Sequence, residues 1–374
     1  MCLYPRLIRN RKYTKTKKNG GIIPPIQDPR VLMIPIGCSR CIECRNQKSR
    51  EWKVRLMEDI KRRKGAKFVT LTFSNEEIAK ITEEAEGRTG YELDNWIAKI
   101  ATRRFLERWR KTTGKSVRHW LITELGQTGT ENIHLHGLIW TDDITMIKEK
   151  WTYGFTWVGE YVNEETINYI TKYVTKIDEK HKGFTPKIMT SAGIGQGYEN
   201  SHDGRNNKYK GKLTKEEYTT RQGVKLALPI YYRNKIYTEE QREKLWLNKL
   251  DKNIRWVCGE KIKGDDWETY IKIVKYHRKR SERLGYGTNQ IPWDQEEYER
   301  NRRMLMMKKR IEEFAPAAWL KEIYANATIK KYASHDNTTR GAAPDPGLIK
   351  RNMDLWEQGE ETWLEKINKN KFGK

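Results

Sequence analysis

Residues 131–140 read ENIHLHGLIW, and side chains of opposite character alternate through the stretch. Successive side chains of a β-strand point to opposite faces of the sheet, so the alternation predicts a strand. His134 and His136 then share one face, while Ile133 and Leu135 lie on the other, which can bury against helices. Two imidazoles side by side on the remaining open face suit the binding of one metal ion through ring nitrogens.

The segment before this strand, residues 118–125 (RHWLITEL), also has the composition of a strand. Residues 126–130 (GQTGT) supply two glycines and small polar side chains, so the two segments are predicted to form a β-hairpin. Glu124 can then reach the histidine face as a third metal ligand, although alternation alone does not fix the strand register. A competing interpretation is that both histidines are ordinary surface residues of a half-buried sheet.

Three further segments complete the predicted core. Residues 67–74 (KFVTLTFS) alternate and are rich in β-branched side chains, which indicates a strand. Residues 94–111 carry apolar side chains at helical intervals and are predicted to pack on the sheet, and residues 151–162 (WTYGFTWVGEYV) have strand composition. Together with the hairpin, these segments predict an α+β fold with a central antiparallel sheet and flanking helices.

Residues 164–177 are predicted to form a helix, and TINYITKYVTK within it separates into two faces. The apolar face is predicted to pack on the rest of the protein, and consists of Ile167, Ile170, Val174 and Ile177. The second face presents two tyrosine–lysine units one helical turn apart, namely Tyr169 with Lys172 and Tyr173 with Lys176.

The tyrosine–lysine units suit nucleophilic catalysis. A tyrosine hydroxyl has an ordinary pKa of about 10 and is a poor nucleophile when neutral. A neighbouring ammonium favours the phenolate and can neutralise charge on a phosphate under attack. The alternative is an ordinary amphipathic helix, in which tyrosine rings lie at the edge of the core and the lysines are solvated.

The charge of the chain points to a polyanionic partner. Among 374 residues, 74 are Lys or Arg and 50 are Asp or Glu, which gives a formal net charge of +24. Nucleic acid is the leading candidate, because basic residues recur along the whole length. Residues 105–111 (FLERWRK) and 228–237 (LPIYYRNKIY) interleave cations with aromatic rings, as a groove for single-stranded DNA does, although each also fits a solvated element with core aromatics. No run of about 18 apolar residues or secretory signal favours a membrane or secreted protein.

The five cysteines indicate a reducing cytoplasm, because their odd number without a signal peptide argues against a disulfide framework. Cys38, Cys41 and Cys44 have C-x-x-C-x-x-C spacing, and Cys2 can add a fourth ligand if the N-terminal segment folds back. Four thiolates suit a structural zinc site. An iron–sulfur cluster and three reduced cysteines at the start of a helix are the alternatives. In each case the basic helix that follows, residues 46–63, can lie against DNA phosphates.

Three regions are expected: a basic N-terminal arm with the cysteine cluster and a helix (1–63), the core (64–180), and a basic, largely helical C-terminal region that contacts DNA (181–374). The first 21 residues are expected to be irregular. In the C-terminal region the sequence predicts a glycine-rich polar segment, a strand, two helices and a loop, at residues 191–204, 226–233, 238–250, 293–314 and 334–347 respectively.

The order of these motifs resembles a known superfamily. Strand 67–74, then Glu124 with HLHGLIW, then the YITKYVTK helix are similar to the HUH superfamily of replication initiator endonucleases, named for two histidines flanking a hydrophobic residue. MCLYP at residues 1–5, GCSRCIECR at 37–45 and the paired tyrosines resemble the replication initiators of microviruses, small single-stranded DNA bacteriophages, particularly the gokushovirus branch. The resemblance covers residues 1–176.

The resemblance implies rolling-circle replication. His134 and His136, with Glu124 as a third ligand, would bind Mg²⁺ or Mn²⁺, and Tyr169 and Tyr173 would be the nucleophiles. One tyrosine would attack the origin, giving a 5′-phosphotyrosyl link and a free 3′-OH, and the second would allow the strand to be cut and rejoined after copying. The partners implied are single-stranded viral origin DNA and the host helicase and polymerase in the bacterial cytoplasm, with no membrane.

Two other functions remain open at the level of sequence. Another HUH enzyme, a relaxase or a transposase, also fits the tandem tyrosines. A non-catalytic basic protein that coats or packages single-stranded DNA fits the charge.

Overall fold

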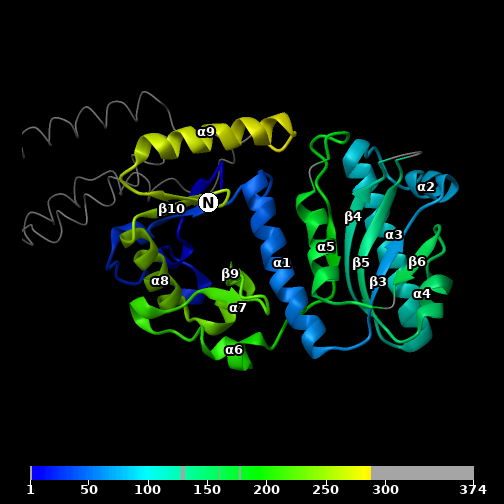
Figure 1. Cartoon of the computed structure of the whole chain (residues 1–374), viewed down its shortest axis with the longest axis horizontal. Helices are drawn as coiled ribbons and strands as arrows, with labels where there is room; N and C mark the ends of the chain where they lie inside the picture. Colours follow the sequence, from blue (N-terminus) through cyan, green and yellow to red (C-terminus); the bar gives the residue numbers. More distant parts are fainter. Residues whose placement is uncertain (1, 128–130, 160, 177, 288–374) are drawn as a thin grey trace, which may run out of the picture. The chain divides into compact units, whose positions relative to one another are not determined.

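The computed structural model describes residues 2–127, 131–159, 161–176 and 178–287. They belong to one compact unit, Met1–Trp293, and the second unit, Asp294–Lys374, lies outside the described residues. A five-stranded sheet has the order β6-β3-β5-β4-β7, and every neighbouring pair is antiparallel (Figure 1). The strands are β3 (Ala66–Leu71), β4 (Arg118–Leu125), β5 (Ile133–Trp140), β6 (Thr156–Gly159) and β7 (Ile188–Thr190). The α+β fold with a central antiparallel sheet is therefore confirmed.

One face of the sheet packs against three helices, α2 (Asn75–Thr82), α3 (Gly90–Thr113) and α4 (Ile144–Lys150). The strands contribute the side chains of one alternation to this core, and α3 contributes a stripe at helical spacing. The residues buried there include Val69, Leu71, Leu121, Leu135 and Ile139 from the sheet and Ile97, Ala101, Phe105 and Trp109 from α3. The predicted packing of this helix on the sheet is confirmed.

The opposite face packs against α1 (Ile42–Arg62) and α5 (Glu164–Thr175) (Figure 1). The expectation of an open face around the two histidines is wrong, because the same alternation that places them there also places large apolar side chains on that face. Trp120, Ile122 and Leu138 are fully buried against the two helices. The histidines therefore lie at the margin of a second core.

Helix α5 begins at a capping box, in which the side chains of Asn163 and Thr166 each accept a hydrogen bond from the other residue's backbone N–H. Its apolar face is buried as predicted through Ile167, Ile170 and Val174. The predicted face residue Ile177 lies outside the described residues. The helix is thus fixed with its tyrosine face toward the histidine strand.

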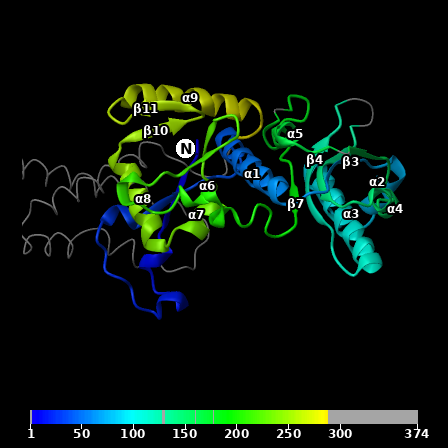
Figure 2. The same ribbon diagram turned by 60° about the horizontal axis from the view of Figure 1, so that its bottom comes forward.

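The rest of the described chain forms small strand pairs and helices (Figures 1 and 2). Three antiparallel pairs are β1 with β2, β8 with β9 and β10 with β11, at Arg6–Arg9, Met33–Ile36, Glu217–Thr219, Lys225–Ala227, Ile254–Val257 and Glu260–Lys263. The remaining α-helices are α6 (His202–Arg205), α7 (Ile230–Ile236), α8 (Glu239–Asp251) and α9 (Trp267–Arg283). Short 3-10 helices lie at Arg11–Tyr13, Lys17–Asn19, Pro29–Val31, Tyr198–Asn200 and Gly211–Leu213.

Two local expectations differ from the structure. The irregular N-terminal segment contains β1, which pairs with β2. The strand predicted at residues 226–233 is wrong beyond Ala227, because Pro229 is the N-cap of α7 and the following residues are helical. Proline cannot donate to a strand ladder, and its fixed φ suits the start of a helix. The predicted helix at residues 238–250 is confirmed as α8, whereas the elements predicted at 293–314 and 334–347 lie outside the described residues.

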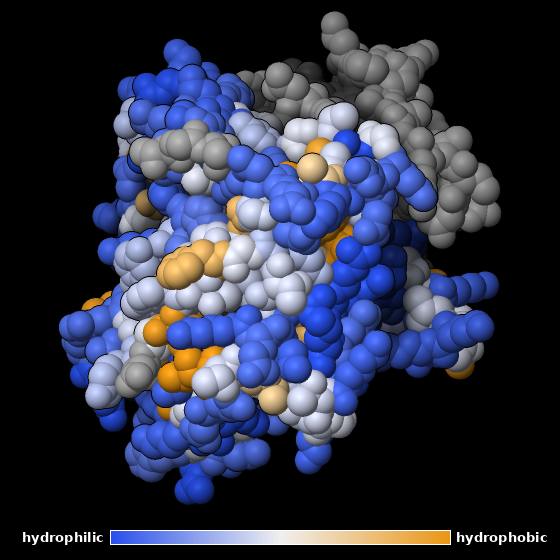
Figure 3. Space-filling view, turned by 90° about the vertical axis from the view of Figure 1, so that its right-hand side faces the viewer, coloured by the Kyte–Doolittle hydropathy of each residue, from blue (hydrophilic) through white to orange (hydrophobic). Residues whose placement is uncertain are grey.

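None of the helices in the described ranges is both long and apolar enough to cross a membrane. Figure 3 shows the side of the molecule that lies at the right of Figure 1, and its atoms are mostly hydrophilic, with only small, separated hydrophobic groups.

Candidate active site and metal centre

The β4–β5 hairpin brings Glu124 to the two histidines. The strand register pairs Glu124 directly with His134, which answers the question that alternation left open. One carboxylate oxygen, Oε2, lies 3.2 Å from His134 Nε2 and 2.9 Å from His136 Nε2. Within the described part of the chain, this is one of two groups whose donor atoms all lie within 4.8 Å of one another. The geometry places these three predicted ligands at a single point.

The other nitrogen of each imidazole is held by a neighbour. His134 Nδ1 lies 3.2 Å from the carbonyl oxygen of Asn132, and His136 Nδ1 lies 3.0 Å from the hydroxyl of Thr70. With both Nδ1 atoms as donors, the Nε2 lone pairs face Glu124, as they do where histidine binds a metal. Two imidazole nitrogens and one carboxylate oxygen fit a divalent cation, with imidazole favouring Mn²⁺ and carboxylate suiting Mg²⁺.

Electrostatics keep the donor atoms unprotonated. Burial would raise the pKa of Glu124, but hydrogen bonds with His134, His136 and Lys176 outweigh it and hold its pKa well below the usual range. Burial lowers the pKa of His136. At neutral pH the centre therefore combines an ionised carboxylate with a neutral imidazole, the forms that bind metals.

The two predicted nucleophiles meet beside this centre. The hydroxyl of Tyr173 donates a hydrogen bond of 2.7 Å to the hydroxyl of Tyr169. The Tyr173 ring stacks on His136, with ring centroids 4.4 Å apart and planes 10° apart. Tyr169 is 50% exposed, whereas Tyr173 is 8% exposed. One phenol therefore faces solvent, and the other lies between it and the imidazole.

The predicted effect of the lysines on the tyrosines differs from what the structure shows. Burial, the hydrogen bond to Tyr169 and the charge of Glu124 all raise the pKa of Tyr173. Lys176 forms an ion pair with Glu124, and its Nζ lies 5.7 Å from the Tyr173 ring centroid. Lys172 is exposed, and its side chain forms no hydrogen bond or ion pair with another described residue. Lys176 thus belongs to the centre through the carboxylate, whereas Lys172 is not brought to it.

Two residues that support the site were not among the predicted site residues. Thr70 orients His136, and the alternation of its strand, which puts it on the face opposite Val69 and Leu71, is the signal that could have found it. Arg45 donates to the carbonyl oxygens of Val174, Phe184 and Lys176 and so holds the end of α5. Its partners lie 129 to 139 residues along the chain, so no local pattern marks it.

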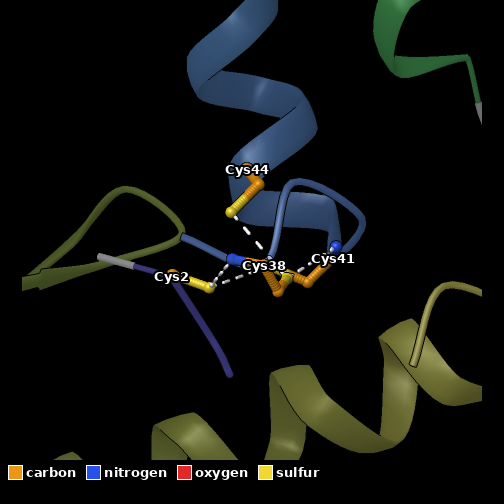
Figure 4. A group of neighbouring side chains, drawn as sticks. All are labelled: Cys2, Cys38, Cys41 and Cys44. Atoms are coloured by element: carbon orange, nitrogen blue, oxygen red, sulfur yellow. Dashed lines mark hydrogen bonds between the residues drawn. The ribbon is translucent and has the colours of Figure 1, made fainter. Parts of the chain in front are cut away.

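The four clustered cysteines form the second group of donor atoms (Figure 4). Cys2 comes from the N-terminal segment, Cys38 from the loop after β2, Cys41 from the N-cap of α1 and Cys44 from its first turn. The predicted folding back of the N-terminal segment is therefore observed. Cys258 lies outside the group, and burial with the nearby charge of Glu43 raises its pKa to about 12.

An antiparallel sheet that presents a Glu–His–His cluster to two tyrosines defines a candidate metal-dependent site. Residues 66–178 match the family described as replication-associated protein ORF2/gene 2 protein. The match begins at β3 and ends just beyond α5, so it contains Glu124, both histidines and both tyrosines. No curated protein and no solved structure shows significant similarity to the chain. This segment is thus similar to proteins of DNA replication, which act on nucleic acid.

Proposed function

We propose that this protein initiates rolling-circle replication by nicking and religating single-stranded DNA at a viral origin through a 5′-phosphotyrosyl intermediate. The observation that carries the proposal is the hydrogen-bonded pair of Tyr169 and Tyr173, stacked on His136 of the Glu–His–His centre. A nucleophile and a metal centre that share one strand and one helix face meet the geometric demand of phosphoryl transfer, which is chiefly positioning.

In the proposed first step Tyr169 is the attacking residue, because its hydroxyl is half exposed and accepts a hydrogen bond from Tyr173. A divalent ion bound by Glu124, His134 and His136 would polarise the scissile phosphate. The Tyr169 oxygen bonds to phosphorus as the bond from phosphorus to O3′ breaks. The hydroxyl proton leaves Tyr169 and the departing O3′ takes up a proton, giving a free 3′-OH and a tyrosyl-linked 5′ end.

Tyr173 has two roles in this scheme. During the first step its hydroxyl stabilises the charge that develops on the Tyr169 oxygen, since a donated hydrogen bond favours an anion. After a round of copying, it becomes the second nucleophile, which cuts the regenerated origin while the first link is resolved. The short path between the two hydroxyls supports transfer of a strand from one tyrosine to the other.

Lys176 and Lys172 have different roles in the proposal. Lys176 holds the second carboxylate oxygen of Glu124, which leaves Oε2 for the histidine side of the centre. Lys172, exposed on α5 next to Tyr173 in sequence, is available to a DNA phosphate.

The wider assignment follows from the same residues. The HUH-like pattern of β5, the tandem tyrosines and the cysteine motif support a microvirus initiator that acts in the bacterial cytoplasm with the host helicase and polymerase. Under this proposal the basic segments outside the core, residues 1–63 and 181–374, contact DNA, as the net charge of +24 favours.

The proposal is tested by trapping the covalent adduct. The full chain is incubated with Mn²⁺ and labelled single-stranded oligonucleotides tiled across the replicon that encodes it, and adducts are resolved on a denaturing gel. We expect one oligonucleotide to give an adduct with the wild type and none with the Tyr169→Phe, Tyr173→Phe double variant. Tyr276→Phe is the matched control, because Tyr276 is an exposed tyrosine on α9.

Three outcomes would overturn parts of the proposal. Absence of an adduct with every divalent ion would favour the non-catalytic DNA-binding alternative. An adduct that survives the double variant would refute the tyrosine assignment alone. Normal cleavage by the His134→Ala, His136→Ala variant would refute the metal centre.

A further inference from the structure

Four of the five cysteines meet where the N-terminal segment crosses the start of α1 (Figure 4). The pairing of β1 with β2 sets Arg6 opposite Ile36, so the residues before β1 lie beside those after β2. Cys2 and Cys38 thereby come together across 36 positions of sequence. The strand pair, and not the C-x-x-C-x-x-C spacing alone, completes the group of four.

The spacing of the sulfur atoms suits a single ion. Cys2 Sγ and Cys41 Sγ are 3.8 Å apart, Cys38 Sγ and Cys44 Sγ are 3.9 Å apart, and all four lie within 4.8 Å of one another. A tetrahedral zinc ion with Zn–S bonds of about 2.3 Å places its sulfurs about 3.8 Å apart. A disulfide needs about 2.05 Å, and an iron–sulfur cluster holds its thiolates further apart because the cluster itself lies between them.

Backbone N–H groups point at the sulfurs. Cys2 Sγ accepts from the N–H of Tyr4 at 3.3 Å and from that of Cys38 at 3.2 Å, and Cys38 Sγ accepts from the N–H of Cys41 at 3.3 Å. Such donors stabilise the negative charge of thiolates. Cys41 and Cys44 also lie at the N-terminus of α1, where the helix dipole favours negative charge.

The surroundings are closed and mostly apolar. The cysteines pack in a cluster with Leu3, Tyr4, Ile42 and Tyr270, among others. At Gly37 a Cβ atom would lie 3.1 Å from Cys44 Sγ, so the absence of a side chain there leaves room for the sulfur. Several thiolates in such a place are costly unless a cation compensates them.

We infer that Cys2, Cys38, Cys41 and Cys44 bind one zinc ion as four thiolates, at a structural site distinct from the Glu–His–His centre and independent of the proposed nicking activity. With four protein ligands it keeps no open position for substrate, so it stabilises structure. It joins the N-terminal segment to α1. The same segment contacts α9, because the Tyr4 hydroxyl donates to Glu282 at 3.0 Å and Arg278 donates to the Leu3 carbonyl at 2.9 Å.

The first test is metal content. The full-length His134→Ala, His136→Ala variant, in which the other centre is disabled, is purified without chelator and measured by plasma mass spectrometry. We expect one zinc per chain, lost when Cys38 and Cys44 are both changed to Ser and retained in Cys258→Ser. Cys258 is the matched control because it packs against the same cluster without belonging to the group of four.

A second test needs no substitution among the four ligands. A thiol reagent is titrated into this purified double-histidine variant, with a chromophoric chelator reporting free zinc, and we expect one zinc to be released as four thiols react. Replacement by Co²⁺ should give the absorption spectrum of a tetrahedral four-thiolate site. Iron in place of zinc, no bound metal, or release uncoupled from thiol modification would each overturn the inference, whatever the result of the adduct assay.

Discussion

Tyr169 and Tyr173 carry the same side chain one helical turn apart, yet their environments differ. Tyr169 is half exposed and leans its ring edge toward Phe68, with centroids 6.0 Å apart. Tyr173 is buried on His136, and its raised pKa keeps it protonated as a hydrogen-bond donor to Tyr169. The two tyrosines are therefore not interchangeable, although the tandem motif makes them look equivalent.

This asymmetry predicts different results for the single variants in the initial cleavage. Tyr169→Phe should reduce the first nick to background, because it removes the attacking oxygen. Tyr173→Phe should slow it by about 10- to 100-fold, since a hydrogen bond to a charged group contributes about 1.5–3 kcal/mol. Single-turnover cleavage of a labelled origin oligonucleotide measures both. Faster cleavage by Tyr169→Phe than by Tyr173→Phe would reverse the assignment.

Thr70 is predicted to set the metal affinity. Thr70→Val keeps the shape of the side chain but removes the hydroxyl that orients His136, so Mn²⁺ affinity should fall by about 10- to 100-fold. Titration of Mn²⁺ by electron paramagnetic resonance measures this, and excess Mn²⁺ should restore cleavage.

The control for Thr70 is Thr72→Val, because the Thr72 hydroxyl bonds to the carbonyl of Phe155 and not to a histidine. Equal Mn²⁺ affinities for the two valine variants would contradict the role assigned to Thr70.

Sequence reasoning reached the site residues unequally. The parity of a strand was enough to place His134 and His136 together, because alternation is a local property. Glu124 needed the hairpin register, which depends on pairing between strands. The partner of Lys176 could not be foreseen, since helical spacing relates it to Tyr173 and only the packing of α5 on the sheet brings it to Glu124.

At the scale of elements, edge strand β6 extends the site. Trp157 lies opposite Thr70, and its indole meets the ring of Phe68 edge-on at 5.5 Å. A Cβ atom at Gly159 would lie 2.7 Å from that indole, so glycine provides the space in which it rests. Trp157 is 49% exposed, and its ring therefore offers a stacking surface for a base close to Tyr169.

Trp157→Ala should weaken binding of a single-stranded origin oligonucleotide by about 5- to 100-fold, because stacking of a base on an aromatic ring contributes about 1–3 kcal/mol. Fluorescence anisotropy measures the affinity. Trp256→Ala on β10 is the matched control, since Trp256 is 53% exposed. A loss as large in Trp256→Ala would show that stacking is not specific to β6.

A polar network joins the segment after α5 to the hairpin loop. His181 Nδ1 lies 2.7 Å from Asp178, and its Nε2 lies 2.9 Å from Glu131. Burial opposes protonation of His181, but the hydrogen bonds to both carboxylates outweigh it and raise its pKa. The network thus holds the loop between β4 and β5 near the end of the tyrosine helix.

The stability contributed by this network should depend on pH. Because the pKa of His181 is higher in the folded state, its contribution is full below the ordinary value of about 6.5 and is lost as pH rises through the raised pKa. Urea unfolding at about pH 6 and about pH 8 should show that His181→Gln costs more stability at the lower pH. The exposed His202 provides the control, and an identical cost of His181→Gln at both pH values would contradict the prediction.

Elements were predictable where local pattern and packing agree. β4 occupies residues 118–125 as predicted, because its composition favours a strand and every residue after Arg118 is buried. Residues 226–233 have equally strand-like composition, but Pro229 starts a helix that buries Tyr232 in another cluster. The covering of the histidine face by α1 and α5 was not predictable, since it depends on contacts between distant segments.

For the whole molecule, the net charge of +24 predicts strongly salt-dependent binding. A site that contacts about six to ten phosphates of single-stranded DNA should give a slope of about −4 to −7 in a plot of log affinity against log salt concentration. Anisotropy titrations of one oligonucleotide over a range of salt concentrations measure it. A slope shallower than about −1 would show that the basic surface contributes little to binding.

The packing of α1 against α5 gives the molecule a mechanical path. Once a DNA end is joined to a tyrosine of α5, tension in the displaced strand pulls on that helix. Arg45 and Ser49 of α1 hold α5 through the carbonyls of Val174, Lys176 and Thr171, so the load passes into a helix 21 residues long. The far end of that strut is fastened among the four cysteines, which makes the proposed zinc site the anchorage of the enzyme while it is tethered to moving DNA.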